Sequence, residues 1–258
     1  MKPLIDADVL LYEIGFACEV GWQGEDVPPF DYAADMLKQR ILHICDTVGA
    51  TEPPTLFFTG ANNFRIALAK TKPYKGNRKD AKPFHYLNLK YYIQNQYDWE
   101  VVDNLEADDL MAIRQGENTI ICTRDKDLRQ VPGWHFSWEL ANQPQFGPLL
   151  VEGYGWIKLS ENKKKIVGVG DKFFFSQCIT GDTVDNIPGL PKYGPDKAFK
   201  ILEGTSTYQE GLEAVVGAYK EVYGENYEEH LVEQAQLLWM VREVIDGKPV
   251  MWGFRDNL

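Results

Sequence analysis

The stretch Lys2-Pro3-Leu4-Ile5-Asp6-Ala7-Asp8 opens the chain with a short apolar segment that runs directly into two acids. The same arrangement returns at residues 55–59, 99–102 and 118–122, where apolar segments are each followed by polar or acidic residues. Segments with helical spacing lie between them. Strands that alternate with helices predict a parallel sheet with right-handed crossovers. Functional sites in such sheets form beyond the carboxyl ends of the strands, so most of the acids are expected at one edge.

Helices are predicted between these strands, because apolar residues recur there every three or four positions. The clearest helix begins near Ala33 and ends at Gly49. Another is expected to run from Asp8, as its cap, to Cys18. Residues 21–29 are rich in Gly and Pro and are expected to form a loop. Further helices are expected at residues 62–68, 83–97 and 105–114.

The chain changes character after Pro132. Short strands are expected at residues 134–138 and 149–151, and helices at 172–180, 196–203, 208–223 and 227–245. The predicted fold class is therefore α/β, with a mostly parallel central sheet flanked by helices and a helical C-terminal part. The expected domains are an α/β core at 1–133, with a basic arch at about 70–97, and a mainly helical part at 134–258. We expect the two to pack as one compact unit.

The composition predicts a folded protein of the cytoplasm. The chain has 258 residues, of which 44% are hydrophobic and 25% charged. No apolar run approaches the roughly 18 residues that a membrane helix needs, and the N-terminus enters a strand directly, without a signal peptide. The four cysteines lie far apart and form no Cys-x-x-Cys pair, which favours reduced thiols: Cys18, Cys45, Cys122 and Cys178.

The net charge of −11 by itself argues against a nucleic-acid partner, because phosphate attracts basic surfaces. Nine of the carboxylates, however, lie in the motifs described below, and without them the remaining charge is −2. A site that held two divalent cations would offset four of those nine charges. The distribution of charge therefore matters more than its total.

Three acidic motifs follow predicted strands. Asp6-Ala7-Asp8 is explained equally well by a helix cap or by a catalytic acid, and a phosphatase-type nucleophile is a further alternative. Glu106-Ala107-Asp108-Asp109 begins a helix, where one acid would stabilise the helix dipole. Three acids in four residues repel one another unless cations are present. Asp125 and Asp127 either open an Asx turn or bind metal, and carboxylate oxygens are the ligands that Mg²⁺ prefers.

The stretch from Thr180 to Pro195, which reads TGDTVDNIPGLPKYGP, is harder to explain as background. Its glycines and prolines predict a rigid turn between helices, whose backbone N–H groups can approach a phosphate closely. The acids and lysines in or beside it are Asp182, Asp185, Lys192 and Lys197, and the turn itself runs from Gly189 to Gly194.

A basic motif, Tyr74-Lys75-Gly76-Asn77-Arg78-Lys79, lies inside the polar stretch 70–82. One interpretation is a solvated loop. The other is a phosphate clamp, in which Lys75 and Arg78 bind a phosphate and Tyr74 stacks on a base.

Taken in this order, the segments LIDAD, YKGNR, EADD, TRDKD and GDTVDNIPGLPKYGP resemble the 5′–3′ exonuclease and flap-endonuclease family, especially its bacteriophage members. They span residues 4 to about 202. The last segment is similar to the family's helix–three-turn–helix element and is the most specific of the five.

The resemblance implies roles for individual residues. Asp6, Glu106 and Asp108 would hold a first Mg²⁺ or Mn²⁺ ion, with Asp109 close by. Asp125, Asp127 and Asp182 would hold a second, with Asp185 in its outer shell. Lys75 and Arg78 would steady the scissile phosphate, and Tyr74 would stack near the displaced end. The DNA backbone would be gripped by the turn, which often also binds K⁺ in this family, through Gly189, Lys192, Gly194 and Lys197.

One departure from the family pattern stands out. An Asp usually ends the second strand in this family, whereas Thr59 and Gly60 occupy that place here. The first metal thereby loses one carboxylate, for which Asp8 or Asp103 could compensate.

The predicted function is a metal-dependent 5′–3′ exonuclease or structure-specific 5′ nuclease that hydrolyses DNA by a two-metal mechanism. The alternatives are a DNA-binding relative that no longer cuts and a haloacid-dehalogenase-like phosphatase with Asp6 as nucleophile. The sequence leaves open exonuclease against flap cleavage, DNA against RNA–DNA hybrids, protein partners and oligomeric state.

Overall fold

The structure is a computed structural model that describes residues 1–23, 26–78 and 81–253. The chain forms two compact units, each of which is described by itself. The first contains Met1–Asn62, Lys79–Lys126 and Gly133–Leu150, and the second Asn63–Arg78, Asp127–Pro132 and Val151–Leu258. Two positions in the predicted arch, including Lys79 of the basic motif, and two in the predicted loop 21–29 lie outside the described residues.

The first unit is built on a six-stranded sheet with the strand order β3-β2-β1-β4-β5-β6. Its central strands pair in parallel: β1 with β2 and β4, β2 with β3, and β4 with β5. The strands are β1 (Lys2–Asp6), β2 (Thr55–Thr59), β3 (Asp98–Val102), β4 (Thr119–Cys122), β5 (Gly133–Ser137) and β6 (Phe146–Val151). The mostly parallel sheet predicted from the sequence is confirmed.

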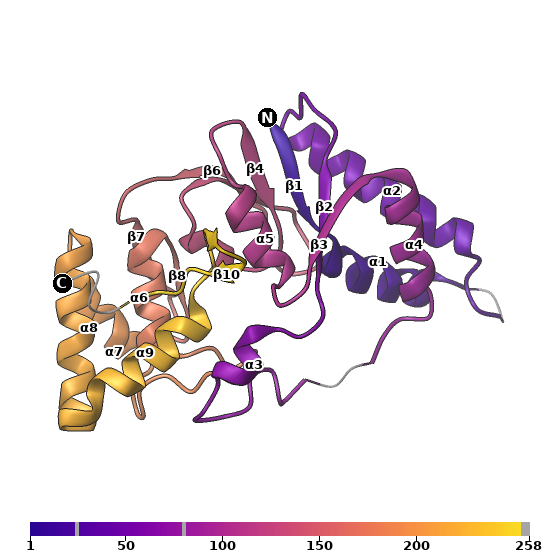
Figure 1. Ribbon diagram of the computed structural model, residues 1–258. Coiled ribbons are helices and arrows are strands. Elements are labelled where there is room, and N and C mark those ends of the chain that lie inside the picture. Colours follow the sequence, from indigo (N-terminus) through magenta and orange to yellow (C-terminus); the bar gives the residue numbers. More distant parts are fainter. Residues whose placement is uncertain (24–25, 79–80, 254–258) are drawn as a thin grey trace. The chain divides into compact units, whose positions relative to one another are not determined.

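Helices cover this sheet as the crossover rule requires (Figure 1). They are α1 (Ala7–Gly21), α2 (Phe30–Thr47), α4 (Tyr86–Gln96) and α5 (Ala107–Arg114). The helices α1, α2 and α4 pack on one face, and α5 lies on the other (Figure 1). Successive side chains of a strand point to opposite faces of the sheet. Ile5 belongs to the core beneath α1 and α2, and its neighbour Leu4 is also buried, so both faces of β1 are covered. The cap of α1 is Asp6, whose side chain accepts from the Val9 N–H, and not Asp8 as predicted.

The second unit is mainly helical, and Figure 1 labels its α-helices together with β7, β8 and β10. They are α3 (Phe64–Leu68), η1 (Asp127–Gln130), β7 (Trp156–Leu159), β8 (Ile166–Val169), α6 (Gly170–Thr180), α7 (Pro195–Leu202), α8 (Tyr208–Tyr223), η2 (Gly224–Asn226), α9 (Tyr227–Leu238), β9 (Val244–Ile245) and β10 (Lys248–Pro249). Its core contains Phe174 and Phe175 of α6, Leu212 and Tyr219 of α8, and Leu231 of α9. Tyr219 is tied across this core by its hydroxyl, which donates to the Cys178 carbonyl at 2.7 Å.

The last predicted helix, 227–245, is wrong beyond Leu238. Trp239 has an extended backbone that ends α9, and the chain then forms the antiparallel hairpin β9–β10. Asp246 and Gly247 make the hairpin turn with positive φ angles of 50° and 74°. An Asp-Gly pair between two short apolar segments is a known hairpin signal, so this turn was visible in the sequence.

Another antiparallel hairpin, β7–β8, was not predicted at all. It precedes α6, and Ser160 and Lys165 join its ends through a backbone hydrogen bond of 2.9 Å. The division at residue 133 also differs from the units observed, because residues 134–150 belong to the first unit and residues 63–78 and 127–132 to the second.

All four cysteines have free thiols, three of them buried. Over the described ranges, no helix is long and apolar enough to cross a membrane.

Candidate active site

The acids of the first unit gather at the carboxyl ends of its parallel strands. Asp6 is the last residue of β1 and is 3% exposed. Its two carboxylate oxygens accept hydrogen bonds from the Val9 N–H at 3.0 Å and from the Thr123 hydroxyl at 2.8 Å. Thr123 also accepts from the Asp125 N–H at 3.0 Å, so one threonine connects two of the predicted metal ligands.

Asp8 reaches the end of the neighbouring strand. Its Oδ2 accepts from the N–H of Thr59, the last residue of β2, at 2.8 Å. The Thr59 hydroxyl in turn accepts from the N–H of Ala107, the first residue of α5, at 3.2 Å. Thr59 therefore links the Asp6-Ala7-Asp8 motif to the acidic start of α5.

This arrangement concentrates negative charge in a poorly hydrated place. Burial, followed by the charges of Asp8 and Asp125, raises the pKa of Asp6 to about 7 despite its two hydrogen bonds. Burial also raises the pKa of Asp8; Glu106 adds to this, while Thr59 and the Lys90 ammonium oppose it. A bound cation would relieve the same repulsion, so the electrostatics suit a metal site.

The start of α5 uses two of its acids as caps. The Glu106 side chain accepts from the backbone N–H three residues on, and Asp109 returns a bond by accepting from the Glu106 N–H at 3.1 Å. Both side chains are buried, whereas Asp108 is partly exposed. Asp109 thus has a structural role that would remain without a metal.

Gly60 turns out to be a packing position. A Cβ atom there would lie 2.0 Å from the Val102 carbonyl oxygen, so an acidic side chain does not fit without backbone movement. Asp8 instead approaches the end of β2, through Thr59. The other suggested substitute, Asp103, accepts from the Ala61 N–H at 3.2 Å and so closes the loop after β2.

The remaining predicted metal ligands belong to the second unit. Asp127 opens η1 and accepts from the Gln177 side-chain amide at 2.6 Å. Asp182 follows α6, and its Oδ1 accepts from the Val184 N–H at 2.7 Å in an Asx turn. Both are buried, with 7% exposure.

Asp185 holds the basic motif in place. It forms an ion pair with Arg78 at 2.5 Å and accepts from the Tyr74 hydroxyl at 3.0 Å. Its carbonyl accepts from the Lys75 N–H at 2.9 Å. Tyr74 is buried in the core of this unit, and its stacking on a base stays a prediction. Lys75 and Arg78 keep 24% and 45% of their side-chain surface exposed.

The turn after α6 is shaped by close backbone approach. Gly189 has a φ of 65°, and a Cβ there would lie 2.3 Å from the Gly181 nitrogen. Its N–H donates to the Gln234 side chain at 3.0 Å, and the contact of Gly189 with the DNA backbone stays a prediction. Lys192 is exposed at the tip, Gly194 caps α7, and the Lys197 ammonium lies 3.3 Å from the centre of the Tyr193 ring.

The donor set suits a hard divalent cation, because every candidate ligand is a carboxylate oxygen. Among the described residues, however, no group of three or more Asp, Glu, His or Cys side chains is arranged closely enough to hold an ion. The described residues therefore fit a divalent cation in the type and charge of their donor atoms, but they do not form a coordination geometry.

Sequence reasoning missed the neutral residues that organise the acids. Thr59 and Thr123 each follow or end a strand and bond a carboxylate, and Gln177 on α6 bonds Asp127. Position at a strand end was a usable signal for the threonines. Gln177 carried none, since it lies 50 residues from its partner.

Comparisons with known proteins agree with the motif-based resemblance. No family model matches the chain. A protein named 5′-3′ exonuclease from Buchnera aphidicola subsp. Schizaphis graminum is 26% identical over 230 residues, which cover 78% of this chain and 70% of that protein. DNA polymerase I of Geobacillus stearothermophilus is 26% identical over 93% of this chain but only 27% of the polymerase. That of Rhizobium leguminosarum is 34% identical over 39% of this chain and 10% of the polymerase, so this chain spans a minor part of such relatives.

Solved structures show the same fold. The T5 D15 protein, co-crystallized with metal ions, superposes with a TM-score of 0.61 at 15% identity, over 92% of this chain and 88% of that one. The catalytic core of Rad2 in complex with DNA substrate superposes with a TM-score of 0.50 at 13% identity, over 98% and 82% of the two chains. These likenesses confirm the predicted fold class.

Proposed function

We propose that this protein is a divalent-metal-dependent 5′–3′ exonuclease or structure-specific 5′ nuclease that hydrolyses DNA phosphodiesters. The observation that carries the proposal is the gathering of Asp6, Asp8 and Glu106 around the ends of β1 and β2, with Thr59 between them. Sequence similarity to a 5′-3′ exonuclease over 78% of the chain supports it. So do structures of the same fold that contain metal ions or DNA.

The metal ligands are proposed unit by unit. In the first unit, the proposed cation ligands are Asp6, Glu106, Asp108 and Asp125, and Asp109 directly follows Asp108 in the sequence. In the second unit the candidates are Asp127 and Asp182. Two Mg²⁺ or Mn²⁺ ions, when bound, would supply an activated water and offset charge on the phosphate and the leaving oxygen. The K⁺ ion at the turn stays a prediction from the family resemblance.

The protein's own cations would orient the substrate. Lys75 and Arg78 extend from a segment anchored on Asp185 and would hold a backbone phosphate by charge-assisted hydrogen bonds. Lys192 and Lys197 would contact the duplex backbone from the turn and from α7. None of these groups reads a base, so recognition would depend on DNA shape and backbone position.

One further candidate has a specific observation in its favour. Gly60 leaves no space for the acid that the family usually carries, which fits a DNA-binding protein that no longer cuts. Asp8 argues for cutting, because it brings another carboxylate to the end of β2.

Cleavage of 5′-labelled blunt duplex, 5′-flap and single-stranded DNA tests the proposal, with Mg²⁺, Mn²⁺ or chelator. Metal-dependent release of label is expected, with a loss of at least a hundredfold in Asp125→Asn. Asp98→Asn makes the same change at the amino end of β3 and is expected to cut normally. Flap binding with no cleavage under any metal would identify the non-cutting protein, and full activity in Asp125→Asn would refute the metal assignment.

A further inference from the structure

Helix α9 carries two consecutive polar side chains that reach two different segments of the second unit. Glu233 Oε1 accepts hydrogen bonds from the backbone N–H groups of Lys70 and Thr71, each at 2.7 Å, and its Oε2 accepts from the Thr71 hydroxyl at 2.6 Å. Gln234, the next residue, accepts from the Gly189 N–H at 3.0 Å. One turn of a helix therefore holds both the start of the basic motif's segment and the turn after α6.

Burial of the charged Glu233 side chain is unfavourable in itself. Glu233 is only 9% exposed, and a buried carboxylate is stable only if it is well hydrogen-bonded. Burial opposes its charge, but the bonds from Thr71 and Lys70 and the nearby His230 outweigh burial, so the pKa of Glu233 lies below its usual value. Three charge-assisted hydrogen bonds therefore join Glu233 to a two-residue segment.

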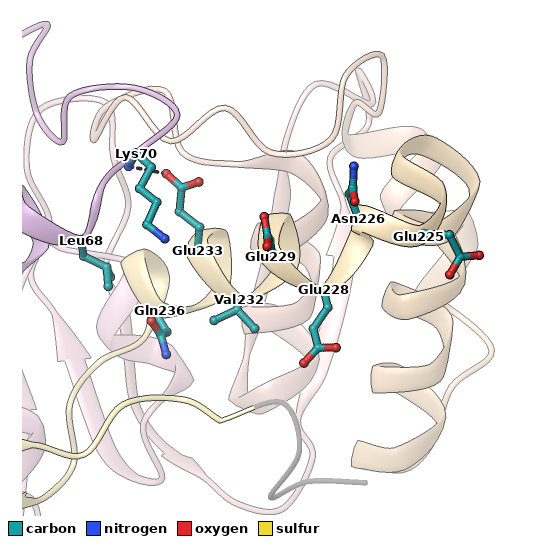
Figure 2. Close-up of a pocket in the computed structure, with 9 residues that line it drawn as sticks. All are labelled: Leu68, Lys70, Glu225, Asn226, Glu228, Glu229, Val232, Glu233 and Gln236. Carbon is teal, nitrogen blue, oxygen red and sulfur yellow. Dashed lines mark hydrogen bonds between the residues drawn. The ribbon is translucent and has the colours of Figure 1, made fainter.

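Figure 2 shows this contact beside a cavity of about 550 Å³ in the second unit. Glu233 turns toward Lys70, whereas Glu225 and Glu228, which come earlier in the chain, point away from Lys70 (Figure 2). Glu229, one turn before Glu233 on the same helix, is exposed. Among the acids of α9, Glu233 bonds the segment that leads to Lys75 and Arg78.

The other end of that segment is fixed independently. Asn186 donates its side-chain amide to the Pro73 carbonyl, and Asn77 donates to the Thr183 carbonyl, both at 2.8 Å. Asp185 completes this anchor through Arg78. The segment 70–78 therefore has two anchors, one on the loop after α6 and one on Glu233.

We propose that Glu233 is a positioning residue for nucleic-acid binding, which holds residues 70–71 so that Lys75 and Arg78 meet the phosphate backbone in fixed register with the turn held by Gln234. This inference rests on the proposed function. Without Glu233, residues 70–71 would have to be ordered when DNA binds, and that ordering would reduce affinity.

The test compares Glu233→Ala with Glu233→Gln, which keeps an acceptor for both N–H groups, and with Glu229→Ala, which removes the same charge from the same helix. Binding to a 5′-flap DNA is measured in chelator at several salt concentrations, and cleavage in Mg²⁺. For Glu233→Ala we expect a roughly tenfold weaker Kd, a salt slope lower by about 1 because one phosphate contact is lost, and a rise in KM larger than the fall in kcat. Glu233→Gln and Glu229→Ala are expected to stay within about threefold of the unmodified protein.

Hydrogen exchange in the same variants shows whether the anchor itself is lost. The amides of Lys70 and Thr71 should exchange faster in Glu233→Ala alone. If Glu233→Ala does not unfold cooperatively, Thr71→Val replaces it, because it removes only the hydroxyl bond, and a two- to threefold weaker Kd is then expected.

An unchanged Kd and salt slope, with faster exchange at Lys70 and Thr71, would overturn the inference while leaving the nuclease proposal intact. A protein that neither binds nor cuts DNA in its unmodified form would refute the proposed function, and the inference would fall with it.

Discussion

Asp6 ends β1, caps α1 and accepts a hydrogen bond from the Thr123 hydroxyl. Its carboxyl group is buried, and burial disfavours its charged form. The conflict between these demands is a physical sign of function, since a carboxylate placed for stability alone would keep its solvation or gain a cationic partner. Asp8 and Asp125 increase the conflict by adding like charge.

The pH dependence of stability follows from this conflict. The pKa of Asp6, about 7 in the folded protein, exceeds its unfolded value, so the stability associated with protonated Asp6 is complete below about pH 4 and is lost as pH rises through 7. In chelator, the unfolding free energy should therefore fall by on the order of 4 kcal/mol from this group between pH 4 and 8. Urea titrations at several pH values should show that Asp6→Asn removes this contribution. An identical pH dependence in both proteins would contradict the raised pKa.

Gly60 gives a different residue-scale prediction. Restoring the family's acid with Gly60→Asp should destabilise the protein by about 3 kcal/mol or more and should not strengthen metal binding, because the side chain would meet the Val102 carbonyl. Chemical denaturation measures the loss. Gly116→Ala, where nothing lies within 4 Å of the added Cβ, is the control and should change stability by less than about 1 kcal/mol. A stable Gly60→Asp protein with tighter Mg²⁺ binding would show that the backbone yields there.

At the scale of elements, the turn after α6 depends on backbone contacts as much as on its residues. Gly181 and Gly189 approach so closely that neither accepts a Cβ, and the backbone N–H groups of Asp182 and Ile187 each donate to the other residue's carbonyl. Glycines and prolines predicted a rigid turn here, and the structure adds that α9 stabilises it through Gln234.

A pair of glycine substitutions tests this turn. Gly189→Ala should lower the stability of the protein by about 3 kcal/mol or more, because φ is 65° and the Cβ would meet the Gly181 nitrogen at 2.3 Å. Gly217→Ala, in the middle of α8 with open space around it, should raise stability by up to about 1 kcal/mol through helix propensity. Thermal unfolding compares them. Equal melting temperatures for the two variants would mean that the turn relaxes freely.

At the scale of the whole molecule, the order of residues along the chain does not match its division into units. The second unit takes in residues 63–78 and 127–132 as well as the C-terminal half. Arg65, which is fully buried, donates to the carbonyls of Leu237 and Trp239. Gln130 donates to the Leu238 carbonyl and accepts from the Met240 N–H. These side chains are integral to the helical unit although they lie more than a hundred residues before their bonding partners in the chain.

A fragment of residues 134–258 is therefore expected not to fold on its own. It lacks the Arg65 and Gln130 contacts and would leave the carbonyls of Leu237, Leu238 and Trp239 without them. Circular dichroism should show reduced helix content and no cooperative thermal transition, while the full chain unfolds cooperatively. A sharp transition in the fragment would support the boundary at residue 133 that the sequence suggested.

The sequence determined those features that depend on local pattern. Apolar segments followed by acids predicted the parallel sheet and the edge at which its acids gather, and the motifs around Asp6, Glu106 and Asp182 supplied the candidate ligands. The same patterns failed where local signals compete. Residues 239–245 kept a helical spacing, but the Asp-Gly turn and the Gln130 contact give them an extended path.

Tertiary structure alone decided which side chains meet. Whether Asp8 reaches β2, whether Gly60 has space for a side chain and whether Tyr74 is buried depend on atoms brought together from distant positions. Glu233 belongs to the same group, since its partners lie more than 160 residues earlier. A residue's type and its near neighbours specify local backbone geometry, but the contacts of a polar side chain depend on the packing of the unit that surrounds it, which local patterns do not encode.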